Sequence, residues 1–267
     1  MLPPDNFDPE IGLAETLEPG LRRIVASNPS PMTYRGTNTY LLGQSEVAVI
    51  DPGPDSPAHL EAILAAVEPG QSISHIIVTH AHGDHTPLAG PLAEATGAPV
   101  LAYGPATRGR SAVMDLLAEQ GGVGGGEGID SGFTPDQRLE DGEEIVGDGW
   151  RLLALWTPGH QCNHLSFDCD TGDGYGVTFT GDHVMGWSTS IVSPPDGDLT
   201  QFMESCDKLR SRPARLYLPG HGPEITDPHG RLDWLVNHRR QRETAIMAAL
   251  RTGSGTAAQL AERVYVD

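Results

Sequence analysis

A run of potential metal ligands occupies residues 79–86, where the sequence reads THAHGDHT. His80 and His82 are two positions apart, so in an extended backbone their side chains point the same way. Asp84 and His85 follow where the chain is predicted to turn into a helix, and the change of direction lets them reach a different point. Because one tetrahedral metal ion needs only three or four protein ligands, the run predicts two metal ions side by side.

Three further candidate ligands each follow a predicted strand and a glycine. His160 lies in TPGH, Asp182 in TGDH and His221 in PGHG. Glycine permits the tight turn that exposes the next side chain at the edge of a sheet. One histidine after a strand is often only a capping or surface residue, but together with residues 79–86 these positions indicate one shared site.

Strands and helices alternate along the chain, and their pattern predicts how the ligands are positioned. Residues 75–79, HIIVT, form an apolar segment typical of a strand buried on both faces. Other strands are predicted at 22–26, 38–42, 46–51, 99–102, 143–146, 150–156, 165–168, 176–180 and 215–218, and helices at 58–67, 84–96, 110–120, 199–209, 231–250 and 257–264. The economical arrangement is two packed sheets covered by helices on both outer faces, a four-layer αββα sandwich of the α/β (α+β) class.

The motifs THAHGDHT, TPGHQCNH, FTGDH and LPGHGP resemble those of the metallo-β-lactamase superfamily, and they span the chain from about Tyr40 to Pro223. The resemblance implies the same αββα fold and a metal-dependent hydrolase with two Zn²⁺ per chain, with Mn²⁺ or Fe as alternatives. It implies that His80, His82 and His160 bind the first metal. It assigns the second metal to Asp84, His85 and His221, with Asp182 bridging the two.

The tail narrows the resemblance to one subgroup. The HRxxRE pattern at residues 238–243 looks like the β-lactamase-like protein 2 hydrolases, which continue into a small helical domain. We therefore predict a catalytic domain at residues 1–225 and a helical C-terminal extension at residues 226–267, a truncated winged-helix-like tail. The Gly-rich residues 121–128 are predicted to form a mobile surface loop, as either a spacer or a substrate lid.

Two departures limit the assignment. β-Lactamases of this superfamily generally have Cys or Ser at the bridging position, so Asp182 argues against a dedicated antibiotic-destroying enzyme. The basic residues with which glyoxalase II enzymes hold glutathione have no counterpart that we can locate in the sequence.

The mechanism predicted for such a site is attack by a metal-bound hydroxide. Two divalent ions can share a water and lower its pKa to near neutrality, and Asp84 is predicted to accept a proton from it. His164, four residues after His160, is a second catalytic candidate, as a support for the ligands, a polarising group or a structural hydrogen-bonding residue. Either a substrate contact or a packing role is possible for four loop residues, Tyr34, Asn38, Met185 and Trp187. A structural or surface role is favoured for His75, His183, His229, His238, Arg239, Arg240 and Arg242.

Composition restricts the partners and the compartment. The chain has 267 residues and a formal net charge of −19, which repels phosphodiester backbones and disfavours RNA. No apolar stretch approaches the roughly 18–20 residues of a membrane span, and the acidic N-terminus lacks the features of a secretory signal. Three cysteines without C-x-x-C spacing indicate free thiols, so a cytoplasmic location without membrane association is predicted; the oligomeric state is not indicated.

Three functions remain open from the sequence. The favoured one is hydrolysis of a small ester, thioester, lactone or β-lactam. The second is a metal-dependent endoribonuclease, which the tail resemblance supports and the net charge disfavours. The third is an iron-dependent oxygenase on the same fold, which metal content would distinguish from a zinc hydrolase.

Overall fold

Four consecutive apolar residues fill β4 (Glu46–Ile50), and their side chains point alternately into two different layers. Val47 and Val49 pack in one cluster with residues of the neighbouring helices, including Ile63 and Leu92. Ala48 and Ile50 belong to a second cluster, which also contains buried residues of the second sheet. The alternation therefore builds one core between the sheets and another between a sheet and its helices.

The computed structural model describes residues 7–121, 128–172, 174 and 176–265. The first sheet has seven strands in sequence order. Strands β1 to β4 pair antiparallel, and the pairs from β4 to β7 are parallel. Besides β4, its strands are β1 (Glu15–Glu18), β2 (Leu21–Val25), β3 (Asn38–Leu42), β5 (Ser72–Ile77), β6 (Val100–Ala102) and β7 (Gln137–Arg138).

The second sheet has five strands in the order β12-β11-β10-β9-β8. Its strands are β8 (Glu144–Gly147), β9 (Trp150–Trp156), β10 (Leu165–Asp170), β11 (Val177–Gly181) and β12 (Leu216–Pro219). The pair β11–β12 is parallel, and the other pairs of these described strands are antiparallel. Strands β9, β11 and β12 therefore run in the same direction, so their carboxyl ends lie at the same edge of the sheet.

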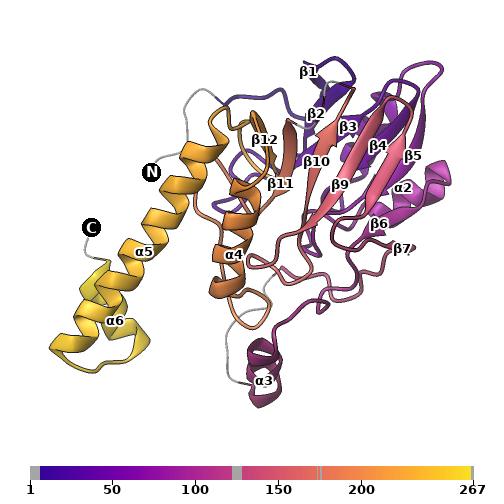
Figure 1. Cartoon of the computed structure of the whole chain (residues 1–267). Helices are drawn as coiled ribbons and strands as arrows, with labels where there is room; N and C mark the ends of the chain where they lie inside the picture. The colour runs from indigo at the N-terminus through magenta and orange to yellow at the C-terminus, as the bar shows by residue number, and fades with distance from the viewer. Residues whose placement is uncertain (1–6, 122–127, 173, 175, 266–267) are drawn as a thin grey trace. The chain divides into compact units, whose positions relative to one another are not determined.

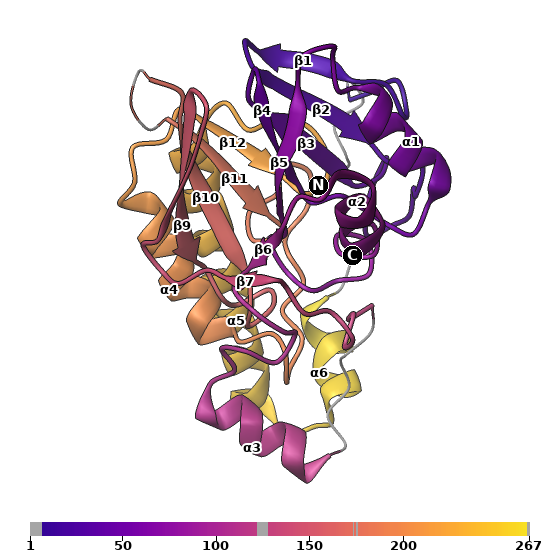
Figure 2. The ribbon, with the colours of Figure 1, turned by 90° about the vertical axis from the view of Figure 1, so that its right-hand side faces the viewer.

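Helices cover the outer faces of both sheets. The crossovers β4–β5 and β5–β6 contain α1 (Pro57–Ala65) and α2 (Ala89–Thr96), and the crossover β11–β12 contains α4 (Leu199–Arg210) (Figure 1). Figure 2 shows α1 and α2 outside the first sheet and α4 outside the second. The predicted αββα fold is thus confirmed.

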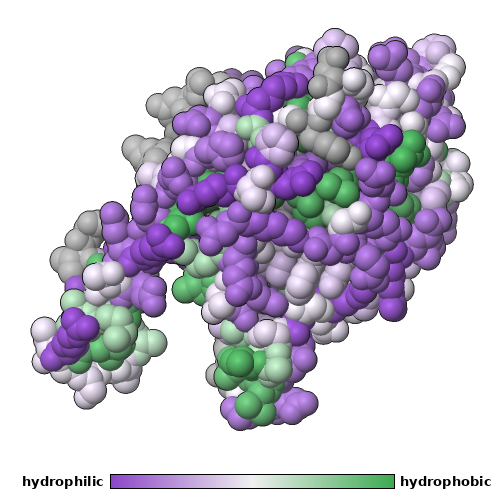
Figure 3. Space-filling model, viewed as in Figure 1, coloured by the Kyte–Doolittle hydropathy of each residue, from purple (hydrophilic) through white to green (hydrophobic). Residues whose placement is uncertain are grey.

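Another helix, α3 (Ala112–Gln120), projects from this body and buries none of its residues. Val113 and Leu116 on this helix are more than half exposed, and Figure 3 shows apolar side chains over its surface. Of the predicted Gly-rich loop at 121–128, residues 122–127 lie outside the described residues.

One local prediction was wrong, and two strands were not predicted. The helix predicted from Asp84 begins only at Ala89, because Pro87 has no N–H and the Leu88 N–H donates to Gly53 O at 3.3 Å rather than within a helix. Strands β1 and β7 were not predicted. They are short and polar, with the sequences ETLE and QR, so no apolar alternation marks them.

The chain divides into two compact units, Met1–Pro228 and His229–Asp267. The described part of the second unit is helical, with most of α5 (Pro228–Thr252) followed by α6 (Ala257–Val264). Arg242 stacks over the Tyr265 ring at 4.7 Å, which joins the two helices. Within the described ranges, no helix combines the length and apolar character needed to cross a membrane.

Candidate metal centre

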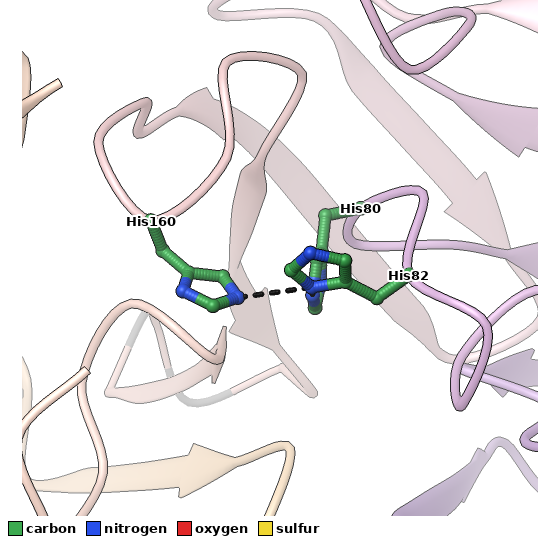
Figure 4. Close-up of side chains that lie close together, drawn as sticks. All are labelled: His80, His82 and His160. Carbon is green, nitrogen blue, oxygen red and sulfur yellow. Dashed lines mark hydrogen bonds between the residues drawn. The ribbon is translucent and has the colours of Figure 1, made fainter. Parts of the chain in front are cut away.

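Three histidines converge at the first half of the site (Figure 4). His80 Nε2 lies 2.8 Å from His82 Nδ1, and His160 Nε2 lies 3.1 Å from the same atom. His80 and His82 follow β5 in the first sheet, whereas His160 follows β9 in the second. Nitrogen ligands about 2.1 Å from a tetrahedral ion are roughly 3.4 Å from one another, so this spacing fits a metal ion.

The second half contains Asp84, His85 and His221. Asp84 Oδ2 lies 3.1 Å from His221 Nε2 and 3.5 Å from His85 Nε2. Thr37 Oγ1 donates to the same carboxylate oxygen at 3.2 Å. His221 follows β12, so this group also draws on both sheets.

Asp182 lies between the two groups. Its Oδ2 is 3.2 Å from His221 Nε2 and 3.7 Å from His160 Nε2. The other oxygen, Oδ1, is 3.6 Å from His85 Nε2. One carboxylate thus touches ligand candidates of both halves, the position that a bridging ligand requires.

The pKa values of these histidines show two features that suit bound cations: a neutral ring that can act as a ligand, and carboxylates that attract positive charge. Burial lowers the pKa of His82 to about 3, which leaves a neutral ring with a lone pair for a metal. Burial also opposes the charge of His221, but Asp182 and Asp84 outweigh it and raise the pKa of His221 to about 10. His85 Nε2 and Asp182 Oδ1 are buried without a hydrogen-bond partner among the described residues. A cation between these atoms would satisfy both.

Asp51, which the sequence analysis did not select, supports the ligands from behind. Its Oδ2 lies 2.9 Å from His85 Nδ1 and accepts a hydrogen bond from Thr79 Oγ1 at 2.9 Å. Thr79 Oγ1 is in turn 2.9 Å from His80 Nδ1. Such partners orient ligand rings and fix their tautomers. The only signal in the sequence is an Asp followed by Pro-Gly at the end of β4.

Glycines precede the ligand candidates of the second sheet because a larger residue would clash with neighbouring atoms. A Cβ atom on Gly159, which has φ of +137°, would lie 2.3 Å from Phe202 Cα in α4. A Cβ atom on Gly220 would lie 2.3 Å from Asp182 Oδ1 and 2.8 Å from His85 Cε1. Close approach, in addition to turn geometry, explains the Gly-ligand pattern.

The family model of the metallo-beta-lactamase superfamily matches residues 32–221, more than half of the chain. The chain belongs to this superfamily. The resemblance inferred from the motifs is confirmed, and membership implies the binding of divalent metal ions, which the donor groups described above fit.

Several relatives of this superfamily member are similar over most of its length. Lactamase-like protein nscB of Neosartorya fischeri is 31% identical, covering 91% of this chain but only 65% of that protein. An atrochrysone carboxyl ACP thioesterase of Aspergillus fumigatus is 29% identical, covering 96% of this chain and 77% of the relative. The beta-lactamase-like protein 2 homolog of Caenorhabditis elegans is 28% identical, with 95% and 79% covered.

Among solved structures, a metallo-beta-lactamase family protein from Thermus thermophilus is 29% identical, with a TM-score of 0.73 and coverage of 94% of this chain and 89% of that one. Together with the relatives, it supports the prediction of an enzyme: the matched region is an enzyme domain of the hydrolase type.

The ligand candidates of this superfamily domain open into a pocket of about 730 Å³, lined among others by His82, Asp84, His160, Asp182 and His221. Its walls are mainly apolar, with contributions from Pro31, Met32, Ile129, Met185, Trp187 and Ile191. Among the described residues, no lysine or arginine lines it. The pocket therefore suits a substrate with apolar parts, and its described lining offers no lysine or arginine to a phosphate.

His164 does not line this pocket. It is fully buried, its Nε2 accepts a hydrogen bond from the Asp182 backbone N–H at 3.2 Å, and its Nδ1 lies 3.0 Å from Thr157 Oγ1. This geometry favours support of Asp182 over contact with a substrate. The catalytic role of His164 stays a prediction.

The other candidates divide between the pocket and the packing. Met185 and Trp187 line the pocket, and Tyr34 stacks on Trp187 with ring centroids 5.2 Å apart. Asn38 is buried, and its amide donates to Pro219 O and Gly222 O, both at 2.9 Å. Structural contacts also occupy three of the histidines set aside: His75 against Trp150, His183 against Phe202, and His238 against Trp234.

Proposed function

We propose that this chain is a dinuclear metal-dependent hydrolase of a small carboxylic ester or thioester with a largely apolar acyl group; lactones and β-lactams offer the same type of carbonyl. The observation that carries the proposal is the position of Asp182, within 4.0 Å of donor atoms in both histidine groups. The relatives named as acyl carrier protein thioesterases support a thioester.

The proposed division of labour follows from the donor groups. One ion would be held by His80, His82 and His160. The other would be held by Asp84, His85 and His221, and Asp182 would bind both ions. Two bound ions, proposed to be zinc, would supply a hydroxide at neutral pH and polarise the carbonyl oxygen.

The protein residues around this centre orient the groups and exclude water. Thr37 and His221 contact the Asp84 carboxylate, which lines the pocket. In the proposed reaction Asp84 would accept a proton from the attacking water. Asp51 and His164 hold His85 and Asp182 from the buried side. The apolar walls exclude water from the acyl group.

A ribonuclease is less well supported. RNA binding relies on cationic side chains, whereas the described lining of the pocket contains no lysine or arginine and the net charge is −19. An oxygenase requires one iron per chain, which metal analysis distinguishes directly.

The test of this proposal is Asp182→Asn, with Asp168→Asn as the matched control. Asp168 is a buried carboxylate paired with Arg212 and Thr178 outside the pocket. We expect about two zinc ions per wild-type chain by elemental mass spectrometry. Asp182→Asn is expected to lose at least one equivalent and to hydrolyse an S-phenyl thioester at least about 100-fold more slowly.

Asp168→Asn is expected to keep both the metal and the activity. An Asp182→Asn protein with two metals and full turnover would overturn the assignment. One iron per wild-type chain, with no hydrolysis, would favour the oxygenase instead.

A further inference from the structure

One wall of the pocket contains an ion pair that the metal centre does not use. Asp196 lines the pocket, and its side chain is only 8% exposed. Arg110 approaches it with two nitrogens, Nε at 3.0 Å and also Nη2, and both contact the same oxygen, Oδ1. Because an arginine–carboxylate fork commonly engages both oxygens, this arrangement leaves the second oxygen available.

The second oxygen, Asp196 Oδ2, has no hydrogen-bond partner among the described residues. An ionised carboxylate can accept about four hydrogen bonds, so Oδ2 can accept one from a donor outside the protein. Since Asp196 faces the pocket, a bound substrate is the molecule placed to supply it.

The segment that carries Asp196 is held firmly against a metal-ligand candidate. The Asp198 N–H donates to Gly159 O at 3.0 Å, and the Ile191 carbonyl lies 2.7 Å from His160 Nδ1. A Cβ atom on Gly197 would lie 2.6 Å from Ser193 N. The loop that carries Asp196 thus contacts the ligand candidate His160 and its neighbour Gly159, so a recognition group on this loop keeps a fixed distance from His160.

The charges around Asp196 restrict the kind of group it accepts. Arg110 compensates the carboxylate from outside the pocket, and the described lining holds no lysine or arginine. An anionic group in this part of the pocket would face Oδ2 with nothing to neutralise it. A neutral donor, such as a hydroxyl or an amide N–H, pairs with Oδ2 directly.

On the basis of the proposed function, we propose that Asp196 Oδ2 is a specificity determinant that accepts a hydrogen bond from the substrate. The preferred substrates are then neutral esters or thioesters with a hydroxyl or amide N–H at a distance from the scissile carbonyl. A site built to bind such a donor rejects an analogue without it more strongly than an apolar pocket rejects an added methyl group.

The experiment compares S-phenyl thioesters that differ only at one ring position. The acyl groups are hydroxyphenylacetyl and methylphenylacetyl, each as the meta and the para isomer. We expect the wild-type kcat/KM to favour the better hydroxyl isomer over its methyl counterpart by at least about tenfold. Asp196→Asn, which keeps an oxygen for Arg110, should bring this ratio close to one, and Asp168→Asn should leave it unchanged.

Binding provides a readout that does not depend on hydrolysis. The N,N-dimethyl amides of the same acids are titrated into the metal-loaded protein by calorimetry. A preference of about tenfold for the hydroxyl compound, lost in Asp196→Asn, supports the inference even where no thioester is cleaved. Failure to cleave then counts only against the proposed function.

Equal affinity of the wild type for hydroxyl and methyl amides would overturn the inference, as would a preference that survives in Asp196→Asn or disappears in Asp168→Asn. If Asp196→Asn does not fold, as judged by its melting temperature, the smaller Asp196→Ser provides the same comparison. Equal cleavage of the hydroxyl and methyl thioesters by the wild type, for both the meta and the para isomers, would reject the role of Asp196 and leave the hydrolase proposal standing.

Discussion

At the scale of single residues, the arrangement behind the ligands is as informative as the ligands. Asp51 adopts a positive φ of 52°, which is uncommon outside glycine and better tolerated by Asp and Asn than by bulkier residues. In that conformation it reaches His85 and both the backbone and the side chain of Thr79. One carboxylate therefore orients histidines of both halves of the site.

This arrangement predicts the effect of Asp51→Asn. The amide nitrogen would present a donor either to Thr79, from which the carboxylate accepts hydrogen bonds, or to His85 Nδ1, which lies 2.9 Å from the carboxylate. We expect metal affinity to fall about 10–100-fold, measured by competition with a chromogenic chelator. Asp168→Asn is the control, and an unchanged affinity in Asp51→Asn would show that Asp51 does not hold His85.

At the scale of elements, the carboxyl ends of parallel strands bring the ligand candidates together at one edge of the sheet. The pairing of β11 with β12 places Gly181 beside Pro219, so Asp182 and His221 follow at one edge. The glycines in these strand–turn segments leave room for side chains of the neighbouring turn. Gly220 is the sharpest case, because its surroundings are the ligand candidates themselves.

Gly220→Ala should therefore damage the site more than the fold. The added methyl group would overlap Asp182 Oδ1 and His85 Cε1, and the φ of Gly220 is not in the left-handed region. We expect metal content to fall and kcat/KM to drop about 10–100-fold, as followed by elemental analysis and thioester hydrolysis. Gly90→Ala is the control because a Cβ atom there meets nothing within 4 Å.

A Gly220→Ala protein with two metals and normal activity would contradict the close packing of the ligands around this glycine. Loss of folding in Gly220→Ala, detected by circular dichroism, would show instead that the turn matters for the fold as a whole.

At the scale of the whole molecule, the proposed metal ions would connect the two sheets. The run 80–85 follows β5 of the first sheet, while His160, Asp182 and His221 follow strands of the second. Without cations, buried carboxylates and histidines of both sheets face one another across the site. Metal ions bound there would stabilise the folded state because the unfolded chain has no such preformed site.

Removal of metal is therefore expected to lower the melting temperature. At a free metal concentration about 1,000 times Kd, one site contributes about 4 kcal/mol. For a domain of this size, that corresponds to roughly 8–16 °C. Differential scanning calorimetry before and after treatment with dipicolinate measures the shift, and zinc should restore it.

Asp182→Asn should show a smaller change on chelation, since it is expected to hold less metal. A melting temperature that dipicolinate leaves unchanged in a protein shown to have lost its metal would reject the idea that metal connects the sheets.

Local pattern was enough to predict the layers of the fold and seven residues that meet at one site. Apolar segments such as residues 75–79 identify strands buried on both faces, and the succession of strand, glycine and ligand places side chains at strand ends. Each of these signals can be read from a few neighbouring residues in the sequence. The boundaries that were wrong, at Asp84 and at the polar strands β1 and β7, are places where a long-range hydrogen bond or sheet pairing replaces a local signal.

Tertiary packing alone decided what surrounds those ligands. The contact of Asp51 with His85, the burial of His164 behind Asp182, and the pairing of Arg110 with Asp196 join residues far apart in the sequence. In the sequence, nothing distinguishes these residues from the many carboxylates, histidines and arginines that lie on protein surfaces. Only the register of the strands and the closure of the two sheets bring them within hydrogen-bond distance, because such contacts depend on the path of the whole chain.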